Sequence, residues 1–460
     1  MRNVHDNVLS CVGDTPIVRL NSVVGDLKSQ VFVKLEMLNP GGSIKDRIAM
    51  QIIADAEARG ELKQGNVIVE GTSGNTGAGL AMAGAVKGYP CTFVMPDKQS
   101  EEKRAALRAY GAKVVVTPTA VEPEDPRSYY SVSTRLGNEE GAYFANQYHN
   151  PSNPEAHFQS TAPEIMEQFG EEVDAIIIGL GTGGTASGIG RYFKQHKPEV
   201  QIVGVDPVGS LYYDYFHTGQ MTDPYTYIIE GIGEDFMPST IDWSVVDDVV
   251  RVNDGECMRM TRRVVQEEGI LCGGSGGAAV AGALKWIQRN DREGQKVLII
   301  LPDSGNRYLS KIFNDNWMRE NGFLDERPGL GLVSDMIRSF GEKREVISVA
   351  PTATVTETIG IMKLHGVSRV PVLEEGQLVG VVSETSLLER ALRGGGAHTR
   401  VRELATADYT TVEAESEVSV LMELFKRAKV AFVIQGEGKR HAVLDIITRI
   451  DLLDYIASRQ

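Results

Sequence analysis

The stretch Gly41-Gly42-Ser43-Ile44-Lys45-Asp46-Arg47 decides how the rest of the chain is interpreted. A glycine turn opens it, and apolar residues at helical spacing follow it, so we expect a helix to begin here. Ser43 stands where an N-cap is expected, and Asp46 has the spacing of a capping box. Lys45 then lies in the first turn of that helix.

Lys45 has two interpretations, because a cation in the first turn lies at the positive end of the helix dipole and costs about 0.5 kcal/mol. The simpler one is an exposed lysine that tolerates this cost. The other is a lysine that works uncharged or covalently occupied, since an amine with a depressed pKa is the better nucleophile toward an aldehyde. The local pattern alone favours the simpler interpretation.

The composition is that of a globular protein without affinity for nucleic acid. The chain has 460 residues and a net charge of −15, and this length allows more than one domain. No apolar run reaches the length of a membrane span, and the N-terminus lacks a signal-peptide core, so a cytoplasmic protein is expected. The cysteines are scattered and indicate neither a disulfide framework nor a metal site; they are Cys11, Cys91, Cys257 and Cys272.

Up to about residue 320, short apolar runs alternate with helical stretches. Unbroken apolar strands between helices predict an α/β fold with parallel sheets covered on both faces. A segment over 118–130, rich in proline and acidic residues, is expected to be exposed. The expected strands lie at 31–35, 67–70, 91–95, 114–116, 175–178, 202–205 and 297–301.

Three glycine-rich loops stand between a strand and a helix. Loop 72–77, Thr-Ser-Gly-Asn-Thr-Gly, and loop 181–185, Gly-Thr-Gly-Gly-Thr, each combine hydroxyls with a helix start and predict anion binding. The second loop also satisfies the dinucleotide fingerprint through Gly179, Gly181 and Gly184, with Asp206 placed for a ribose. In the third loop, 271–277, Ser275 is by itself best interpreted as a helix cap.

Together these loops and Lys45 resemble the fold-type II pyridoxal-phosphate enzymes of the cysteine synthase/cystathionine β-synthase family. The resemblance covers residues 8–320, and it implies a fold of two three-layer parallel-sheet subdomains. It includes the motifs Val12–Pro16, Ala145–Tyr148, Asn150–Pro154 and Leu301–Gly305.

The resemblance implies a role for each loop. Lys45 would hold pyridoxal 5′-phosphate covalently and later move the α-proton of the substrate, while Asn75 bonds the phenolic oxygen and Ser275 meets the pyridine nitrogen. The cofactor phosphate would be held by Gly181, Thr182, Gly183, Gly184 and Thr185. The substrate would be bound by Thr72, Ser73, Thr76, Gln147, Tyr148 and Gly231.

Two activities of this family compete. The loop Glu230–Pro238 and Tyr148 resemble the cystathionine β-synthases, which condense L-serine with L-homocysteine and can release hydrogen sulfide from cysteine. O-Acetylserine sulfhydrylase is the alternative, and a nicotinamide-dependent oxidoreductase is a remote one. Glu234 departs from the tyrosine that is usual in the animal synthases. Because no N-terminal extension with haem ligands precedes the catalytic part, no haem is expected, and no metal.

Beyond Trp317 the chain contains an internal repeat of about sixty residues. Segment 348–355 matches 411–418, and segment 380–388 matches 445–453. Both halves resemble a tandem CBS-domain pair, a Bateman module. The expected organisation is a catalytic domain at 1–320, a linker at 321–331, and CBS domains at 332–395 and 398–460.

The resemblance to CBS pairs also implies a place for an adenosyl ligand. The second repeat keeps a ribose clamp, Thr448 with Asp451, whereas the first has Ser383 with Ser386. Asp445 adds a negative charge that should repel polyphosphates. We therefore expect a module that mainly assembles a homodimer or larger homo-oligomer, with activation by S-adenosylmethionine as the alternative.

Overall fold

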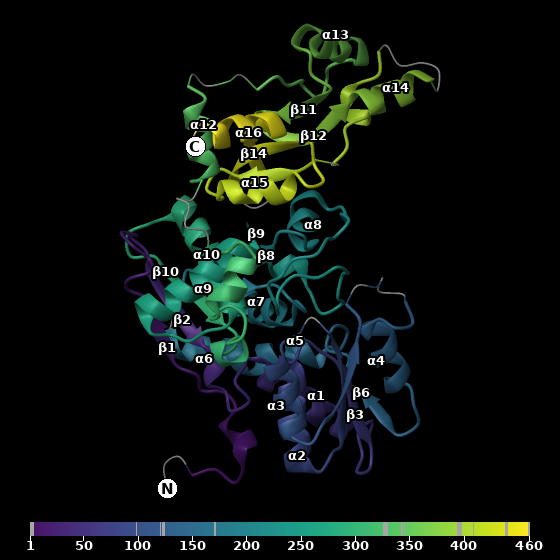
Figure 1. Ribbon diagram of the computed structural model, residues 1–460, viewed down its shortest axis with the longest axis vertical. Coiled ribbons are helices and arrows are strands. Elements are labelled where there is room, and N and C mark those ends of the chain that lie inside the picture. Colours follow the sequence, from purple (N-terminus) through teal and green to yellow (C-terminus); the bar gives the residue numbers. More distant parts are fainter. Residues whose placement is uncertain are drawn as a thin grey trace. The chain divides into compact units, whose positions relative to one another are not determined.

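A computed structural model describes residues 4–97, 99–119, 121, 125–169, 172–324, 330–341, 344, 346–392, 398–407, 409–437 and 440–458. The chain divides into two compact units (Figure 1). The large unit comprises Met1–Tyr213 and Asp223–Glu326, and the small unit comprises Asp214–Thr222 and Arg327–Gln460. Residues 325–329 of the expected linker lie outside the described residues. Within the described residues, no helix is long and apolar enough to cross a membrane.

The large unit contains two sheets. One has the strand order β5-β4-β3-β6 and is parallel throughout. The other has the order β1-β2-β10-β7-β8-β9, and only its edge strand β1 runs antiparallel. The strands are β1 (Ile17–Arg19), β2 (Gln30–Leu35), β3 (Val67–Gly71), β4 (Cys91–Pro96), β5 (Lys113–Thr117), β6 (Ala142–Phe144), β7 (Ala175–Gly179), β8 (Gln201–Pro207), β9 (Asp248–Val252) and β10 (Lys296–Leu301).

All seven expected strands are present, and the predicted parallel sheets are confirmed. Sequence reasoning missed β1, β6 and β9. The first two have three residues each, too few for a pattern. Strand β9 is fully buried, but Asp248 and Arg251 interrupt its apolar run, so it does not look like a core strand.

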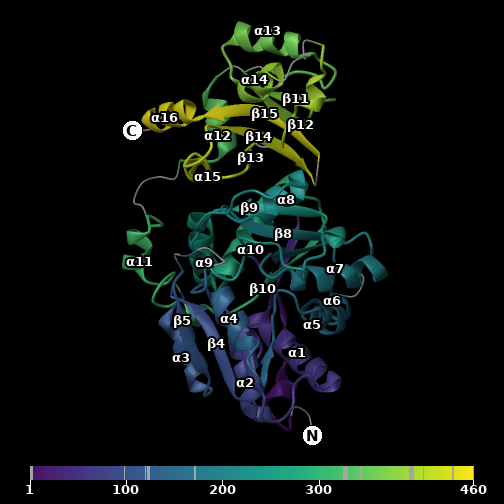
Figure 2. The same ribbon diagram turned by 90° about the vertical axis from the view of Figure 1, so that its right-hand side faces the viewer.

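Helices cover both sheets, and each sheet has a buried cluster of its own. Helix α10 packs on β7, β9 and β10, whereas α2 and α4 pack on β3 and β4. Figure 2 shows α2 and α4 in the part of the large unit that contains β4 and β5. Two separate cores make the large unit a pair of subdomains. The helices are α1 (Lys45–Arg59), α2 (Asn75–Lys87), α3 (Glu101–Ala109), α4 (Tyr129–Gly137), α5 (Ser152–Ala156), α6 (Ala162–Phe169), α7 (Gly184–His196), α9 (Asp254–Glu268), α10 (Gly274–Asn290) and α11 (Asp315–Glu320). Most residues of α8 (Tyr212–Thr218) are counted with the small unit.

Helix α1 begins at Lys45, as predicted, but the predicted capping box is wrong. The N-cap is Ile44, which makes no capping side-chain bond. The Ser43 hydroxyl accepts the Lys45 N–H at 3.2 Å, and the Asp46 carboxylate accepts the N–H of Gly41 at 2.6 Å. The glycine turn folds back onto the helix start, so Asp46 fixes the turn instead of capping the helix.

The small unit is built around one sheet with the order β11-β12-β15-β14-β13. Strand β13 runs parallel to β14, and the bridge Val349–Val372 is its parallel counterpart in the first half. The internal repeat is therefore confirmed. The elements are α12 (Val333–Ser339), α13 (Val355–His365), β11 (Arg369–Glu374), β12 (Gln377–Ser383), α14 (Glu384–Leu392), β13 (Thr411–Glu413), α15 (Val418–Leu424), β14 (Val430–Glu437), β15 (Arg440–Thr448) and α16 (Arg449–Ala457).

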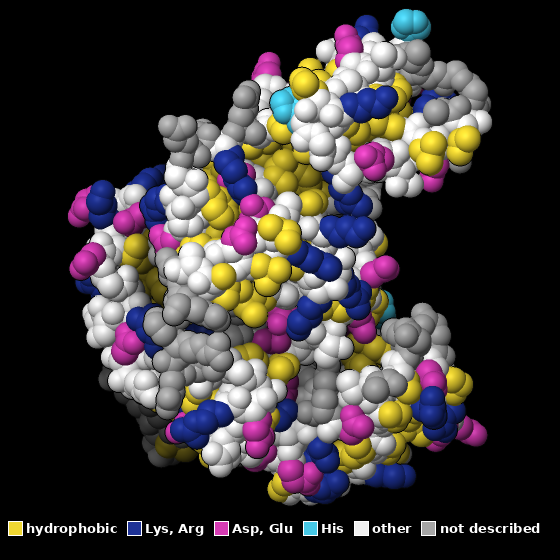
Figure 3. Space-filling model, turned by 45° about the horizontal axis from the view of Figure 1, so that its top comes forward, with side chains coloured by type: hydrophobic (Ala, Val, Ile, Leu, Met, Phe, Trp, Pro, Cys, Tyr) yellow, Lys and Arg dark blue, Asp and Glu magenta, His cyan; other side chains and the backbone are white. Residues whose placement is uncertain are grey.

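The surface carries charges of both signs. On the face in Figure 3, acidic and basic side chains are interspersed. This face therefore offers no uniformly basic patch to attract a polyanion, and the net charge of −15 is also unfavourable for binding one.

Candidate active site

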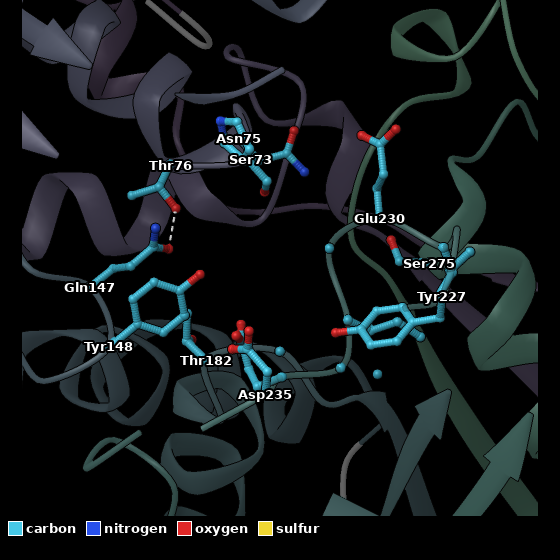
Figure 4. Close-up of a pocket in the computed structure, with 18 of the residues that line it drawn as sticks. Ser73, Asn75, Thr76, Gln147, Tyr148, Thr182, Tyr227, Glu230, Asp235 and Ser275 are labelled. Atoms are coloured by element: carbon cyan, nitrogen blue, oxygen red, sulfur yellow. Dashed lines mark hydrogen bonds between the residues drawn. The ribbon is translucent and has the colours of Figure 1, made fainter. Parts of the chain in front are cut away.

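A pocket of about 540 Å³ lies in the large unit, where the carboxyl ends of strands from both sheets meet (Figure 4). This edge is the usual ligand-binding position in open α/β sheets. The pocket brings together most of the sequence-predicted residues, namely Lys45, Ser73, Asn75, Thr76, Gln147, Tyr148, Gly181, Thr182, Gly183, Thr185, Gly231 and Ser275. Thr72 and Gly184 are not among its lining residues.

Four helices, α1, α2, α7 and α10, begin at this pocket. The N-cap residues of the last three are Gly74, Gly183 and Gly273, which have no side chain to offer as a cap. The first N–H groups of a helix have no carbonyl partner within the helix, and the dipole adds positive potential there. These helix starts therefore form binding sites for anionic groups.

The Lys45 side chain is half-buried and lines the pocket, so the simpler interpretation as an exposed lysine is wrong. Burial lowers its pKa to about 8, although the carboxylates of Asp303 and Glu234 oppose this shift. An appreciable fraction of the amine is uncharged near neutral pH. Lys45 can therefore act as a nucleophile and exchange a proton.

Loop 181–185 is held in a conformation that leaves the Thr182 hydroxyl free to donate. Gly183 has a φ of +80°, and a Cβ there would lie 2.4 Å from Cβ of Ile241. Thr182 Oγ1 accepts from Asn153 Nδ2 at 2.9 Å and, more weakly, from the Gly184 N–H at 3.4 Å. Since two donors face this oxygen, the hydroxyl hydrogen of Thr182 remains available for a ligand.

Loop 72–77 is tied to neighbouring segments by its side chains. Asn75 Nδ2 donates to Asp303 at 2.8 Å, and the Thr76 hydroxyl donates to Gln147 Oε1 at 2.6 Å (Figure 4). Thr72 lies behind the loop, where its hydroxyl accepts the Gly74 N–H at 3.0 Å. The structure thus places Thr76 and Gln147 at the pocket and uses Thr72 to hold the loop.

The structure contradicts two alternative interpretations, Ser275 as a helix cap and Asp206 as the ribose-binding carboxylate of a dinucleotide site. Ser275 is not the helix cap, because Gly273 is the N-cap of α10; instead Ser275 is buried and faces the pocket. Asp206 is fully buried, and its carboxylate accepts the N–H of Tyr213 at 2.9 Å. The carboxylate required for a nicotinamide-dependent site is therefore directed into the protein.

The pocket has an aromatic and acidic wall, and sequence reasoning predicted its Tyr148 but missed Tyr129 and Tyr130. The hydroxyls of Tyr129 and Tyr148 lie 3.1 Å apart, and the Tyr130 hydroxyl donates to Asp235 at 3.1 Å. The expectation that segment 118–130 is exposed is wrong at its end, because Tyr129 and Tyr130 line the pocket. The helix N-cap at Ser128 was the available signal.

Glu230, the first residue of the loop Glu230–Pro238, also lines the pocket. Its carboxylate accepts from Lys103 at 2.5 Å and Lys311 at 2.6 Å. Lys103 belongs to α3, whereas Glu230 and Lys311 belong to the subdomain of the six-stranded sheet. The buried Glu230 carboxylate therefore links the two subdomains beside the pocket, and the two lysine ammonium groups offset its negative charge.

Residues 8–303 match the family of pyridoxal-phosphate-dependent enzymes, and residues 333–393 and 401–458 match the CBS domain. The chain is 38% identical over 473 residues to cystathionine β-synthase of Oryctolagus cuniculus, covering 98% of this chain and 85% of the relative. The chain belongs to the cystathionine β-synthase family. Because the alignment covers 98% of this chain, it includes both the large and the small unit.

Two further relatives match a smaller share of the chain. Cysteine synthase of Staphylococcus aureus is 42% identical over 306 residues, which cover 66% of this chain and 96% of the relative. The crystal structure of O-ureido-L-serine synthase superposes with a TM-score of 0.62 at 38% identity, covering 71% of this chain and 98% of that structure. Within this family, the large unit has the fold of the pyridoxal-phosphate-dependent enzymes.

The small unit has a pocket of about 310 Å³ beside the expected ribose clamp. Asp451 Oδ2 accepts from both the N–H and the hydroxyl of Thr448, at 2.7 and 2.6 Å, which closes a capping box on α16. Arg344 Nη1 donates to Asp451 Oδ1 at 2.6 Å, and its guanidinium lies 3.4 Å from Asp445. Arg344 therefore offsets the charge that was expected to repel polyphosphates.

Proposed function

We propose that the chain condenses L-serine with L-homocysteine to L-cystathionine in a pyridoxal-phosphate-dependent β-replacement. The observation that carries this proposal is the convergence of Lys45, with its lowered pKa, and four helix starts on one pocket. Relatives named cystathionine β-synthase support it, because they align with the large and the small unit alike. Cysteine in place of serine would release hydrogen sulfide by the same route.

The residues present fit the cofactor. The Thr182 hydroxyl and the first N–H groups of α7 suit a phosphate, the Asn75 amide suits a ring oxygen, and the Ser275 hydroxyl suits a ring nitrogen. Lys45 is the amine that would hold the aldehyde. When bound, pyridoxal phosphate supplies the electron sink for carbanion chemistry at the substrate α-carbon.

The substrate is positioned by the loop after β3. We propose that the N–H groups at the start of α2, with Ser73, Thr76 and Gln147, hold the carboxylate of serine. The hydrogen bond from Thr76 to Gln147 fixes both side chains before the substrate arrives. A preorganised site of this kind places the α-hydrogen of serine within reach of Lys45 at little entropic cost.

Lys45 then carries one proton from the substrate α-carbon to the leaving group. Its neutral Nζ takes the proton from Cα, and the resulting ammonium gives it to the departing hydroxyl of serine, since hydroxide is a poor leaving group. A pKa of about 8 suits both steps, because the amine accepts and releases a proton near neutral pH. The thiol of homocysteine then adds at Cβ, and its proton would pass to Lys45 and from there to Cα, which restores the Cα–H bond of the product.

The cysteine synthase reaction is the second candidate, because the Staphylococcus aureus cysteine synthase matches 66% of this chain at 42% identity. Steady-state turnover of serine and O-acetylserine, each with homocysteine and with sulfide, separates the two. We expect the highest kcat/KM for serine with homocysteine. A preference for O-acetylserine with sulfide would replace our proposal, and a protein without a visible cofactor band would refute both.

We propose that the small unit mainly assembles a homo-oligomer, at least a dimer, and is not a nucleotide sensor. The engagement of both Asp451 oxygens by Thr448 and Arg344 supports this, because a ribose would have to displace them. Light scattering of the full-length protein should give a dimer or larger species. Micromolar binding of S-adenosylmethionine with a several-fold rate increase, lost in Asp451→Ala, would favour the adenosyl-regulated alternative.

Two subsidiary proposals concern haem and compartment. We propose that the reaction proceeds without haem, since the electron sink that pyridoxal phosphate supplies is sufficient for β-replacement. We also propose a cytoplasmic enzyme, because its four cysteines are free thiols. A haem absorption band in the purified protein would contradict the first proposal.

A further inference from the structure

The motif Leu301–Gly305 begins at the last residue of strand β10, and none of its residues contacts the substrate in the proposed reaction. Its Asp303 is fully buried and lies beside the segment that carries Lys45. Ser43 and Asp303 form an antiparallel bridge, and the Ile44 N–H donates to the Pro302 carbonyl at 2.8 Å. Asp303 therefore lies next to the catalytic lysine segment while facing loop 72–77.

The Asn75 amide is held from both ends by this motif and the residues after it. Its Nδ2 donates to Asp303 Oδ2 at 2.8 Å, and Arg307 Nη1 donates to its Oδ1 at 2.5 Å. A carboxylate only accepts hydrogen bonds and a guanidinium only donates them. Turning the amide over would place oxygen against oxygen and N–H against N–H, so one orientation is enforced.

This orientation leaves one N–H of Asn75 without a protein acceptor among the described residues. Asn75 lines the pocket, close to Ser73 and Thr76 in Figure 4. The amide therefore offers the pocket a hydrogen-bond donor. A fixed donor favours the ionised form of an oxygen atom placed against it.

The environment of Asp303 supports a functional role. The Tyr308 hydroxyl also donates to Oδ2, at 2.7 Å, while Oδ1 is buried without a hydrogen-bond partner. Oδ1 packs against Gly273, where a Cβ would lie 2.0 Å from it. A buried carboxylate with an unpartnered oxygen costs stability, and such exceptions in native proteins call for an explanation.

We propose that Asp303 is a positioning residue of the reaction, which together with Arg307 locks the Asn75 amide with an N–H directed at the cofactor ring oxygen. The inference rests on the proposed function, in which Asn75 meets that oxygen. Arg307 also donates to the carbonyl of Gly41, so the lock extends to the turn before Lys45.

The test compares Asp303→Leu with Asp303→Asn in the pyridoxal-phosphate-loaded full-length protein. The absorption bands report the ratio of ionised to protonated ring oxygen, and equilibrium dialysis gives the cofactor dissociation constant. Leucine removes the acceptor, so we expect the ratio to fall about fivefold, as for the loss of one hydrogen bond. Asparagine keeps an acceptor oxygen, so its ratio should stay near the wild-type value.

Two further variants complete the experiment. Tyr308→Phe removes the other donor to Asp303 and leaves the Asn75 contact, so it should preserve the band ratio. Arg307→Met removes the donor to the Asn75 amide oxygen, so it should also lower the band ratio. Arg307 is only half-buried, so this variant provides a test even if Asp303→Leu fails to fold. Unchanged ratios and dissociation constants in folded Asp303→Leu or Arg307→Met would overturn the inference. A wild-type protein that binds no pyridoxal phosphate would instead overturn the proposed function.

Discussion

The two units each place a hydroxyl-bearing loop before a helix, but they treat the helix start in opposite ways. In the large unit, α2, α7 and α10 begin after glycines and carry no capping side chain at the N-cap. In the small unit, α16 begins with a complete capping box, and an arginine engages the remaining carboxylate oxygen. The same strand–loop–helix arrangement is thus prepared for a ligand in one unit and internally satisfied in the other.

The difference shows that a loop motif is not by itself a binding site. Polar groups bind a ligand where the protein leaves their donors or acceptors without an internal partner, and such groups cost stability until the ligand arrives. The hydroxyl hydrogen of Thr182 is available to a ligand in the pocket, whereas the hydroxyl of Thr448 donates its hydrogen to Asp451. Four substitutions test this comparison.

The largest effect is expected for Lys45→Ala. Turnover of serine with homocysteine should fall at least ~1,000-fold, because the nucleophilic amine and the proton carrier are both lost. Lys45→Arg keeps the positive charge but cannot release a proton, so it should be equally inactive. Retention of most of the wild-type rate in either variant would refute the assignment.

Lys45→Ala should also change the stability of the cofactor-free protein. The folded-state pKa of Lys45 is lowered from 10.5 to about 8, so charging the buried amine opposes folding below pH 8. The alanine variant should be the more stable one at pH 7. This advantage should shrink as the pH rises from 8 toward 10.5, where the amine is neutral in both states; urea unfolding across this range measures it.

A smaller loss is expected for Gly183→Ala, which should weaken pyridoxal-phosphate binding about 100-fold. The new methyl group would meet Ile241, and the φ of +80° is unfavourable for alanine, so the phosphate loop has to shift. The matched control is Gly269→Ala, which has a φ of +72° at the end of α9 but open space around it. Its cofactor affinity, measured by equilibrium dialysis, should remain that of the wild type.

Gln147→Ala should raise the KM for serine about tenfold and leave the resting cofactor spectrum unchanged. Gln147 is assigned to the substrate carboxylate, and loss of one charge-assisted hydrogen bond has this magnitude. Thr72→Val should raise KM less, because the Thr72 hydroxyl holds the loop from behind. A collapsed spectrum with unchanged serine affinity would reverse the two roles.

The smallest effect is expected for Arg344→Ala, which would leave a carboxylate oxygen in the small unit without its internal partner. Removing the guanidinium leaves Asp451 Oδ1 free to accept from a ribose, so titration calorimetry with adenosine, which carries no phosphate for the two carboxylates to repel, should show tighter binding by about tenfold. Catalytic turnover should not change. Equal binding before and after the substitution would show that Arg344 does not restrict the clamp.

Much of this architecture follows from local sequence patterns. Continuous apolar runs predicted seven of the ten strands described in the large unit, because strands buried on both faces need apolar side chains at most positions. The glycine-rich loops and Lys45 were recognised because backbone turns and anion sites require particular residues at particular spacing. The repeat identified the small unit in the same way, as two matching segments at a fixed interval.

Tertiary structure decided which side chain meets which. Asp303 and Asn75 are 228 residues apart, and no periodicity connects them. Packing also buried Asp206, brought Tyr129 and Tyr130 to the pocket, and placed Thr72 behind its loop. The low pKa of Lys45 has the same origin, since burial is its main cause. Sequence therefore determined which residues are available for chemistry. Burial and long-range contacts determined the pKa, orientation and hydrogen-bond partners of those residues, because both depend on how distant segments pack.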